Sequence, residues 1–167
     1  GERHGGKRGR GSENKAPFVA AVQVSDENHP LYMRFNAIAN FRRKTIKDWA
    51  AHALAIETHA VSDGLSCFKG INDAGCQHTP CVTGGGYSSM DNTLFTWVNT
   101  MLGNVKNSLT GTYHTLNPKH LPRYLSEFNY RFNRRFDLPS MIPRLIWVAL
   151  RTAPMPERLL KLAESQW

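Results

Sequence analysis

The stretch WVNTMLGNVKNSLTGTYH (97–114) carries residues whose types and spacing could act on phosphates. Read as a helix, it places Asn99 and Lys106 seven residues apart, two turns along, and therefore on one face. An apolar stripe at helical spacing runs beside them: Leu94, Val98, Met101, Leu102, Val105 and Leu109. Asn99 and Lys106 lie on the shoulder of this stripe, where a helix packed on a sheet could present both to a site. The alternative is a polar helix shoulder that faces water.

An acidic residue upstream extends this candidate site. The segment THAVSDG (58–64) predicts a short buried strand that ends on Asp63. An Asp followed by Gly64 is also typical of a simple turn or cap, and that interpretation stays open. An acid, an amide and a lysine together are a candidate for phosphate chemistry.

The charge of the chain is positive and clustered. The net charge is +8, and three segments, 1–15, 42–48 and 119–135, carry +3, +3 and +4, which is more than the whole excess. Clustering of this kind favours a polyanionic partner, and nucleic acid is the first candidate. Solvated helix faces are the alternative.

The 167 residues fit one folded domain with a substantial core. The three cysteines, Cys67, Cys76 and Cys81, form no CxxC pair, which favours reduced thiols in a cytosolic protein. No signal peptide is visible. The longest apolar run, 141–150, contains Pro143 and Arg144 and is too short to span a bilayer.

The pattern along the chain predicts a mixed α/β fold. Strands are expected at 18–24 and 31–41 as an antiparallel hairpin, then at 58–63 and 78–83. Helices are expected at 43–54 and 97–114, from about 118 or 122 onward, near 140–151 and near 156–164. Residues 1–15 are predicted to be a basic flexible loop or tail, and GGGYSS (84–89) a flexible loop.

Several of these segments together resemble a known family, the bacterial insertion-sequence transposases with a DDE-type, RNase-H-like catalytic domain. The similarity is to the branch whose third catalytic position can be Asn, followed seven residues later by Lys. The matching segments are VSDG (61–64), WVNTMLGNVK (97–106), GTYH (111–114) and RYLSEFNYRFNRRF (123–136), and the basic GGKRGRG (5–11) also suits the family. The resemblance implies a partial catalytic domain at 16–116 and carboxy-terminal helices at 117–167.

The resemblance implies two-metal phosphoryl transfer at DNA ends, with cleavage and strand transfer supported by Mg²⁺ or Mn²⁺. Asp63 matches the second acidic position and would bind metal. Asn99 matches the third, where its amide oxygen would be a weaker ligand than a carboxylate. Lys106 would contact a phosphate as a point charge.

The basic segments 1–15 and 119–135 would then bind the phosphates of double-stranded DNA, at transposon ends and target. The residues expected to do so are Lys7, Arg8, Arg10, Lys106, Arg131, Arg134 and Arg135. The resemblance also implies a homo-oligomer on DNA and no association with a membrane. The location that it implies is cytoplasmic and nucleoid-associated, in a bacterium.

One departure from the family concerns the first catalytic Asp, which the resemblance places on a central strand before Gly1. The chain is therefore expected to be a carboxy-terminal fragment that lacks this strand and has no strand-transfer activity alone. Three alternatives remain. They are a non-catalytic nucleic-acid-binding protein that keeps the fold, an interaction protein with an acidic partner, and a hydrolytic nuclease with the same metal site.

Overall fold

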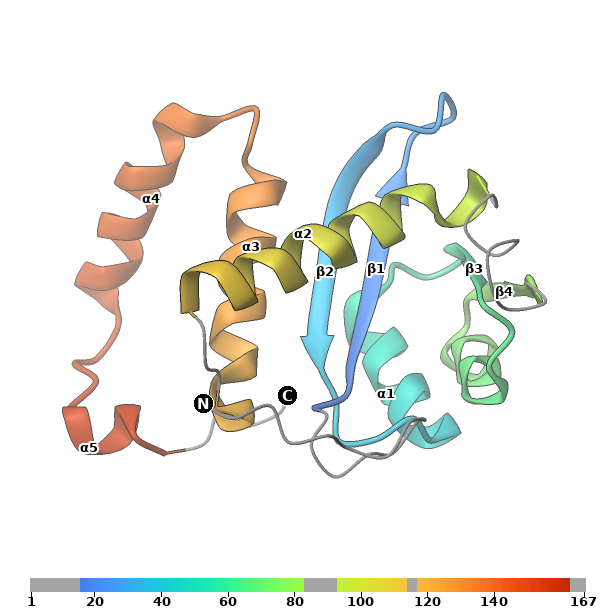
Figure 1. Cartoon of the computed structure of the whole chain (residues 1–167), viewed down its shortest axis with the longest axis horizontal. Coiled ribbons are helices and arrows are strands. Elements are labelled where there is room, and N and C mark those ends of the chain that lie inside the picture. The colour runs from blue at the N-terminus through green and yellow to red at the C-terminus, as the bar shows by residue number, and fades with distance from the viewer. Residues whose placement is uncertain (1–15, 83–92, 114–116, 163–167) are drawn as a thin grey trace.

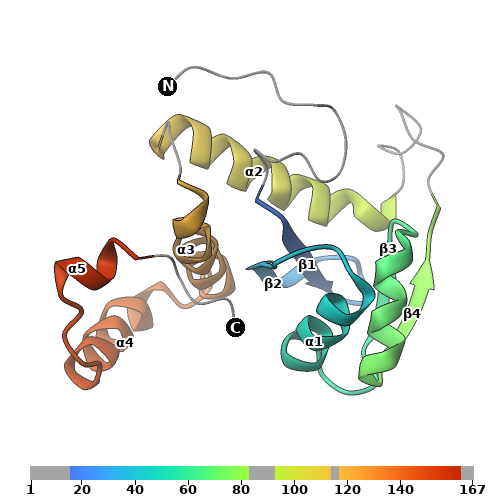
Figure 2. The ribbon, with the colours of Figure 1, turned by 90° about the horizontal axis from the view of Figure 1, so that it is seen from below.

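A computed structural model describes residues 16–82, 93–113 and 117–162. The strands lie in the middle of one part of the molecule, with helices on both sides, and the last two helices stand to one side (Figures 1 and 2). The predicted loops at 1–15 and 84–89 lie outside the described residues, as does His114.

The predicted hairpin is confirmed. Strand β1 (Phe18–Val24) pairs antiparallel with β2 (Pro30–Ala37). The second strand is shorter than predicted, because it ends at Ala37 and the chain then bends at Ala39 and Phe41. The side-chain oxygen of Asn40 accepts hydrogen bonds from the backbone N–H of Arg42 and the hydroxyl of Thr45, and these bonds shape the entry into the next helix.

Helix α1 (Arg43–Ala53) and the 3₁₀ helix η1 (Ser66–Ala74) cover one side of the strands. The helix predicted at 43–54 is confirmed, and its residues Ile46 and Ala50 are fully buried. The two elements approach closely at Gly70, where an added Cβ would lie 2.3 Å from the carbonyl oxygen of Arg43. A bidentate ion pair between Arg43 and Asp73 joins them at the surface.

A second pair of strands follows α1. Strand β3 (His59–Ser62) and β4 (Gln77–Pro80) pair in parallel, each a little shorter than predicted. The prediction that the first of these strands is buried is wrong: only Ser62 is buried, because β3 has a covered face at Ala60 and Ser62 and an exposed face at His59 and Val61.

Helices α2 (Thr96–Tyr113) and α3 (Leu121–Asn133) cover the other side of the hairpin. The short 3₁₀ helix η3 (Thr93–Phe95) precedes α2, and the 3₁₀ helix η4 (Pro118–His120) precedes α3. Asn117 accepts a hydrogen bond from the backbone N–H of Lys119, as expected of a cap. The buried side chains of this layer come from β2, α2 and α3: Met33, Phe35, Met101, Val105, Leu121 and Leu125.

Two asparagines of α3 pair with the backbone of β2 along the edge that faces away from β1. Asn129 donates to the carbonyl of Phe35 and accepts from its N–H, both at 2.9 Å. Asn133 does the same for Met33, at 2.9 and 2.7 Å. The amides therefore satisfy backbone groups that would otherwise be an open sheet edge.

The mixed α/β class is confirmed, but the described strands form two separate two-stranded sheets instead of one. In an antiparallel pair, the backbone N–H and C=O groups of successive residues point alternately toward and away from the partner strand. Those of Phe18, Ala20 and Val22 point away from β2. The strands lie in the order β2, β1, β3, β4 in both views (Figures 1 and 2), so the open edge of β1 is on the side of β3.

Two helices follow α3, α4 (Leu138–Arg151) and α5 (Glu157–Leu160), close to the predicted positions. The start of α4 is held by Tyr130, whose hydroxyl donates to the carbonyl of Met141 at 2.8 Å. The end of α5 is held by Lys119 and Arg123, which donate to the carbonyls of Lys161 and Leu160.

The amide pairs predict a measurable loss of stability in Asn129→Ala. The substitution leaves the N–H and carbonyl of Phe35 without partners in a partly buried place, and we expect it to cost about 2 kcal/mol. Urea unfolding with an unchanged slope measures this loss. Asn107→Ala is the matched control, because Asn107 is an exposed helical Asn on α2, and it should change stability by less than about 0.5 kcal/mol. Equal effects of the two substitutions would contradict the structural role of the pair.

Candidate functional site

Asp63 lies immediately after β3, at an exposed position. One carboxylate oxygen accepts a hydrogen bond from the backbone N–H of Leu65 at 3.2 Å, which fixes a tight turn. Gly64 has a φ of +79°, and a Cβ there would lie 2.8 Å from a methyl carbon of Val82. The sequence Asp-Gly is thus required locally by the turn, whatever else Asp63 does.

Sequence reasoning missed a polar pair directly beside Asp63. The hydroxyl of Ser62, which is 8% exposed, lies 2.8 Å from Nε2 of His78 on the neighbouring strand. Burial lowers the pKa of His78, and nearby His59 lowers it further. The parallel register that brings Ser62 and His78 together is not visible in the sequence, so no local signal marks them.

Helix α2 holds Asn99 and Lys106 as predicted. Both are exposed, while Met101 and Val105 on the neighbouring face are buried, so the two polar residues lie beside the packed face. Gly103 lies between them on the same face, and a Cβ added there would meet no atom within 4 Å. Within the described residues, neither Asn99 nor Lys106 forms an ion pair or hydrogen bond through its side chain.

The structure brings the beginning of α2 beside β3, as both views show (Figures 1 and 2). Asn99 in the first turns of α2 and Asp63 at the end of β3 therefore belong to neighbouring elements. No hydrogen bond joins their side chains within the described part of the chain. Among the same residues, no group of three or more His, Cys, Asp or Glu side chains is placed to hold a metal ion.

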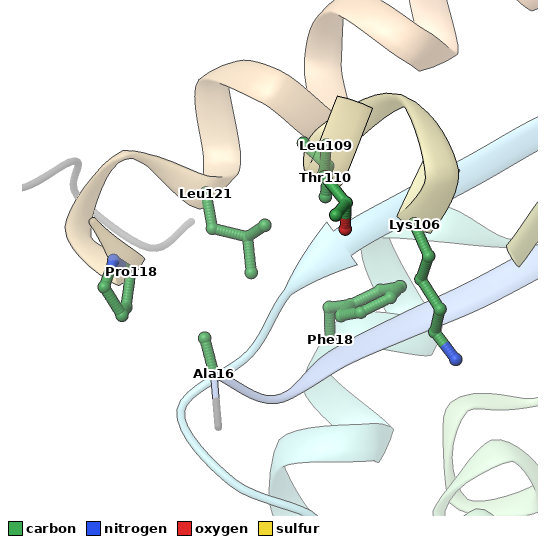
Figure 3. A pocket seen from close by; sticks show the side chains of 7 residues that line it. All are labelled: Ala16, Phe18, Lys106, Leu109, Thr110, Pro118 and Leu121. Carbon is green, nitrogen blue, oxygen red and sulfur yellow. The ribbon is translucent and has the colours of Figure 1, made fainter. Parts of the chain in front are cut away.

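A shallow hollow of about 290 Å³ lies farther along α2, between the start of β1 and the start of α3. Most of its lining is apolar, and Figure 3 shows the amine of Lys106 beyond the ring of Phe18, turned away from Leu121 and Pro118. The aliphatic stem of Lys106 covers apolar surface while its charge stays in water. The hollow lacks the polar groups of a catalytic site, but it leaves the lysine accessible.

The arginines at the end of α3 differ in how they are engaged. Arg131 is exposed and forms an ion pair with Glu127 at 3.4 Å. The guanidinium of Arg134 stacks on Tyr130, 4.2 Å from the ring centre. Arg135 donates to the carbonyls of Pro30, Leu31 and Phe132 and stacks on two aromatic rings.

These contacts give Arg135 a structural role between the hairpin and α3, and they leave Arg131 as the most accessible arginine of the three. Arg134 is half-buried, with its guanidinium stacked on the ring of Tyr130. Lys7, Arg8 and Arg10, also expected to bind phosphates, lie outside the described residues.

Comparison with known proteins assigns the chain to a family. Residues 1–133 match the family model of the ISXO2-like transposase domain. The chain belongs to this family of insertion-sequence transposases, and a general role in DNA transposition follows. No curated protein and no solved structure matched the chain.

The match ends at Asn133, the last residue of α3, so α4 and α5 lie beyond the family domain. In the part of the chain that the structure describes, no helix has both the length and the apolar character needed to cross a bilayer.

Proposed function

We propose that the chain binds the ends of double-stranded DNA and supplies part of a DDE-type site for cleavage and strand transfer. Asp63 and Asn99 are the proposed metal-binding residues, and Lys106 is the proposed phosphate contact. The observation that carries this proposal is the placement of the beginning of α2 beside β3, in a chain whose first 133 residues match a transposase domain.

The donor types suit Mg²⁺ or Mn²⁺, since carboxylate and amide oxygens are the ligands that hard divalent cations prefer. The donor number is small, because within the described residues no group of three or more His, Cys, Asp or Glu side chains is placed to hold a metal ion. A bound metal would activate the attacking oxygen and stabilise the leaving one. We assign two roles to the chain's own residues. Asp63 and Asn99 supply part of the metal ligand set, and Lys106 holds a phosphate.

The DNA-binding part of the proposal rests on Lys106 and the arginines of α3. Lys106 lies two turns from Asn99 on α2, with an exposed amine, so a phosphate held by Lys106 would lie along the helix from the metal-binding residues. Arg131 and Arg134 would add contacts near the end of α3. Arg135 is a weaker candidate, since its donors are already used by backbone carbonyls.

Substitution of Lys106 tests the proposed phosphate contact. In Lys106→Ala, we expect the dissociation constant for blunt-ended duplex DNA to rise about threefold to tenfold. The slope of log affinity against log salt should become smaller by about 1, because one phosphate contact is lost. Fluorescence anisotropy across a salt series measures both quantities.

Lys44→Ala is the matched control, because it removes the same charge from α1, on the opposite side of the strands (Figure 2). Equal losses in the two variants would mean that DNA responds to net charge alone, and that result would remove Lys106 from the site.

We further propose that residues 1–167 alone do not join DNA strands. The proposed ligands are one carboxylate and one amide, and the described residues hold no group of three or more His, Cys, Asp or Glu side chains placed to bind a metal, which is too few for the two Mg²⁺ ions that in-line displacement requires. A strand-transfer assay with labelled DNA ends and Mg²⁺ or Mn²⁺ should give no joined product above the background of Asp63→Asn. Metal-dependent joining by the unaltered chain that this substitution abolishes would contradict the prediction.

A second candidate is a non-catalytic DNA-binding protein of the same fold. It is favoured by the lack of a three-ligand group of His, Cys, Asp or Glu within the described residues. For this candidate, Lys106→Ala should also weaken DNA binding, but no metal needs to bind at Asp63. Metal binding that depends on Asp63 therefore separates the two candidates.

A further inference from the structure

Two histidine–hydroxyl contacts of the same kind join the short strands β3 and β4. In the parallel register, Ser62 pairs with Pro80, so its contact with His78 runs diagonally across the two strands. The contact between His59 and Thr79 is also diagonal, with 2.8 Å between Nε2 and Oγ1. Because side chains alternate along a strand, the first contact lies on the covered face of this sheet and the second on the exposed face.

The contact between Ser62 and His78 continues into the turn that carries Asp63. The hydroxyl oxygen of Ser62 also accepts a hydrogen bond from the backbone N–H of Gly64, at 3.4 Å. The carboxylate of Asp63 accepts one from the N–H of Leu65, at 3.2 Å. Two successive side chains thus each hold the N–H that lies two residues ahead, and together they shape the backbone that presents Asp63.

The position of the Ser62 hydroxyl depends on His78. The backbone of Ser62 is already fixed, because its carbonyl accepts a hydrogen bond from the N–H of Cys81 at 2.7 Å. Its side chain could still adopt three staggered rotamers. The 2.8 Å contact with His78 holds it in one of them, whichever tautomer the ring adopts. The bond from Gly64 is longer than an ordinary N–H···O bond, so it depends on this rotamer.

We propose that His78 is a positioning residue for metal binding at Asp63 and that it acts through the hydroxyl of Ser62. This inference rests on the proposed function, since it adds His78 to the region assigned to Asp63 and Asn99. Removing a group that orients a metal ligand without touching the metal typically weakens metal binding about tenfold to a hundredfold. The contact of His59 lies on the other face of the sheet and outside the turn, so it has no such role.

Substitution of the two histidines separates positioning from general support of the sheet. In His78→Leu, the dissociation constant for Mn²⁺, measured by broadening of the Gly64 and Leu65 amide signals, should rise about tenfold. His59→Leu is the matched control, because it removes the same kind of contact from the exposed face, and the constant should stay within about twofold. His78→Gln should restore most of the affinity, because an amide can donate to the Ser62 hydroxyl or accept from it.

A second measurement needs no metal. In the metal-free chain, amide hydrogen exchange at Gly64 and Leu65 should become at least about threefold faster in His78→Leu and stay unchanged in His59→Leu. Ser62→Ala breaks the same contact by a smaller change and should have the effect of His78→Leu, so the test remains decisive if the leucine disturbs the fold.

Two results would overturn the proposal: equal effects of His78→Leu and His59→Leu, or unchanged Mn²⁺ binding and amide exchange in both His78→Leu and Ser62→Ala. A lack of Mn²⁺ broadening in the unaltered chain would contradict the proposed function instead. Amide exchange would then decide the role of His78 alone, since faster exchange in His78→Leu supports it and unchanged exchange overturns it.

Discussion

The pairing of two helical amides with the edge of a strand is the constraint on which the arrangement of this protein depends. Residues four apart on a helix are about 6 Å apart along its axis, and residues two apart on a strand are nearly 7 Å apart. Asn129 and Asn133 can therefore each pair with a strand residue, Phe35 and Met33, and α3 serves as a third strand for the hairpin. This pairing fixes the direction of α3.

Much of the remaining structure follows from that direction. With α3 fixed on β2, Leu121 and Leu125 reach the layer that α2 also covers, and α2 is held across the hairpin. The same pairing closes one edge of the hairpin and leaves β1 open on the side of β3. The region of α2 that holds Asn99 is thus positioned by contacts that do not involve Asn99.

The elements of the fold were predictable because their apolar periodicity is strong. The hairpin, α1, α2 and α3 all begin within a few residues of the predicted positions, and the stripe of α2 is buried at Met101 and Val105. The edge pairing was not predicted, although a signal exists: Asn129 and Asn133 continue the row of Leu121 and Leu125 at four-residue spacing. A polar residue in a buried row needs a polar partner, but the sequence does not say which strand supplies it.

The candidate site was predictable only in part, for a similar reason. The shared face of Asn99 and Lys106 follows from helical geometry alone. The pair of Ser62 and His78 depends on a parallel register between strands that are separated by η1, and no local pattern encodes it. The exposure of β3 was also missed, because a short apolar run does not reveal how many of its faces are covered.

The central claim is that Asp63 and Asn99 form parts of one metal-binding region, and paramagnetic relaxation by Mn²⁺ tests it most directly. In an amide NMR titration, signals from Gly64 and Leu65 and from the first two turns of α2 should broaden together at the same low Mn²⁺ concentrations. Asp63→Asn should remove both effects. Broadening confined to one of the two segments, or unchanged by the substitution, would contradict the account.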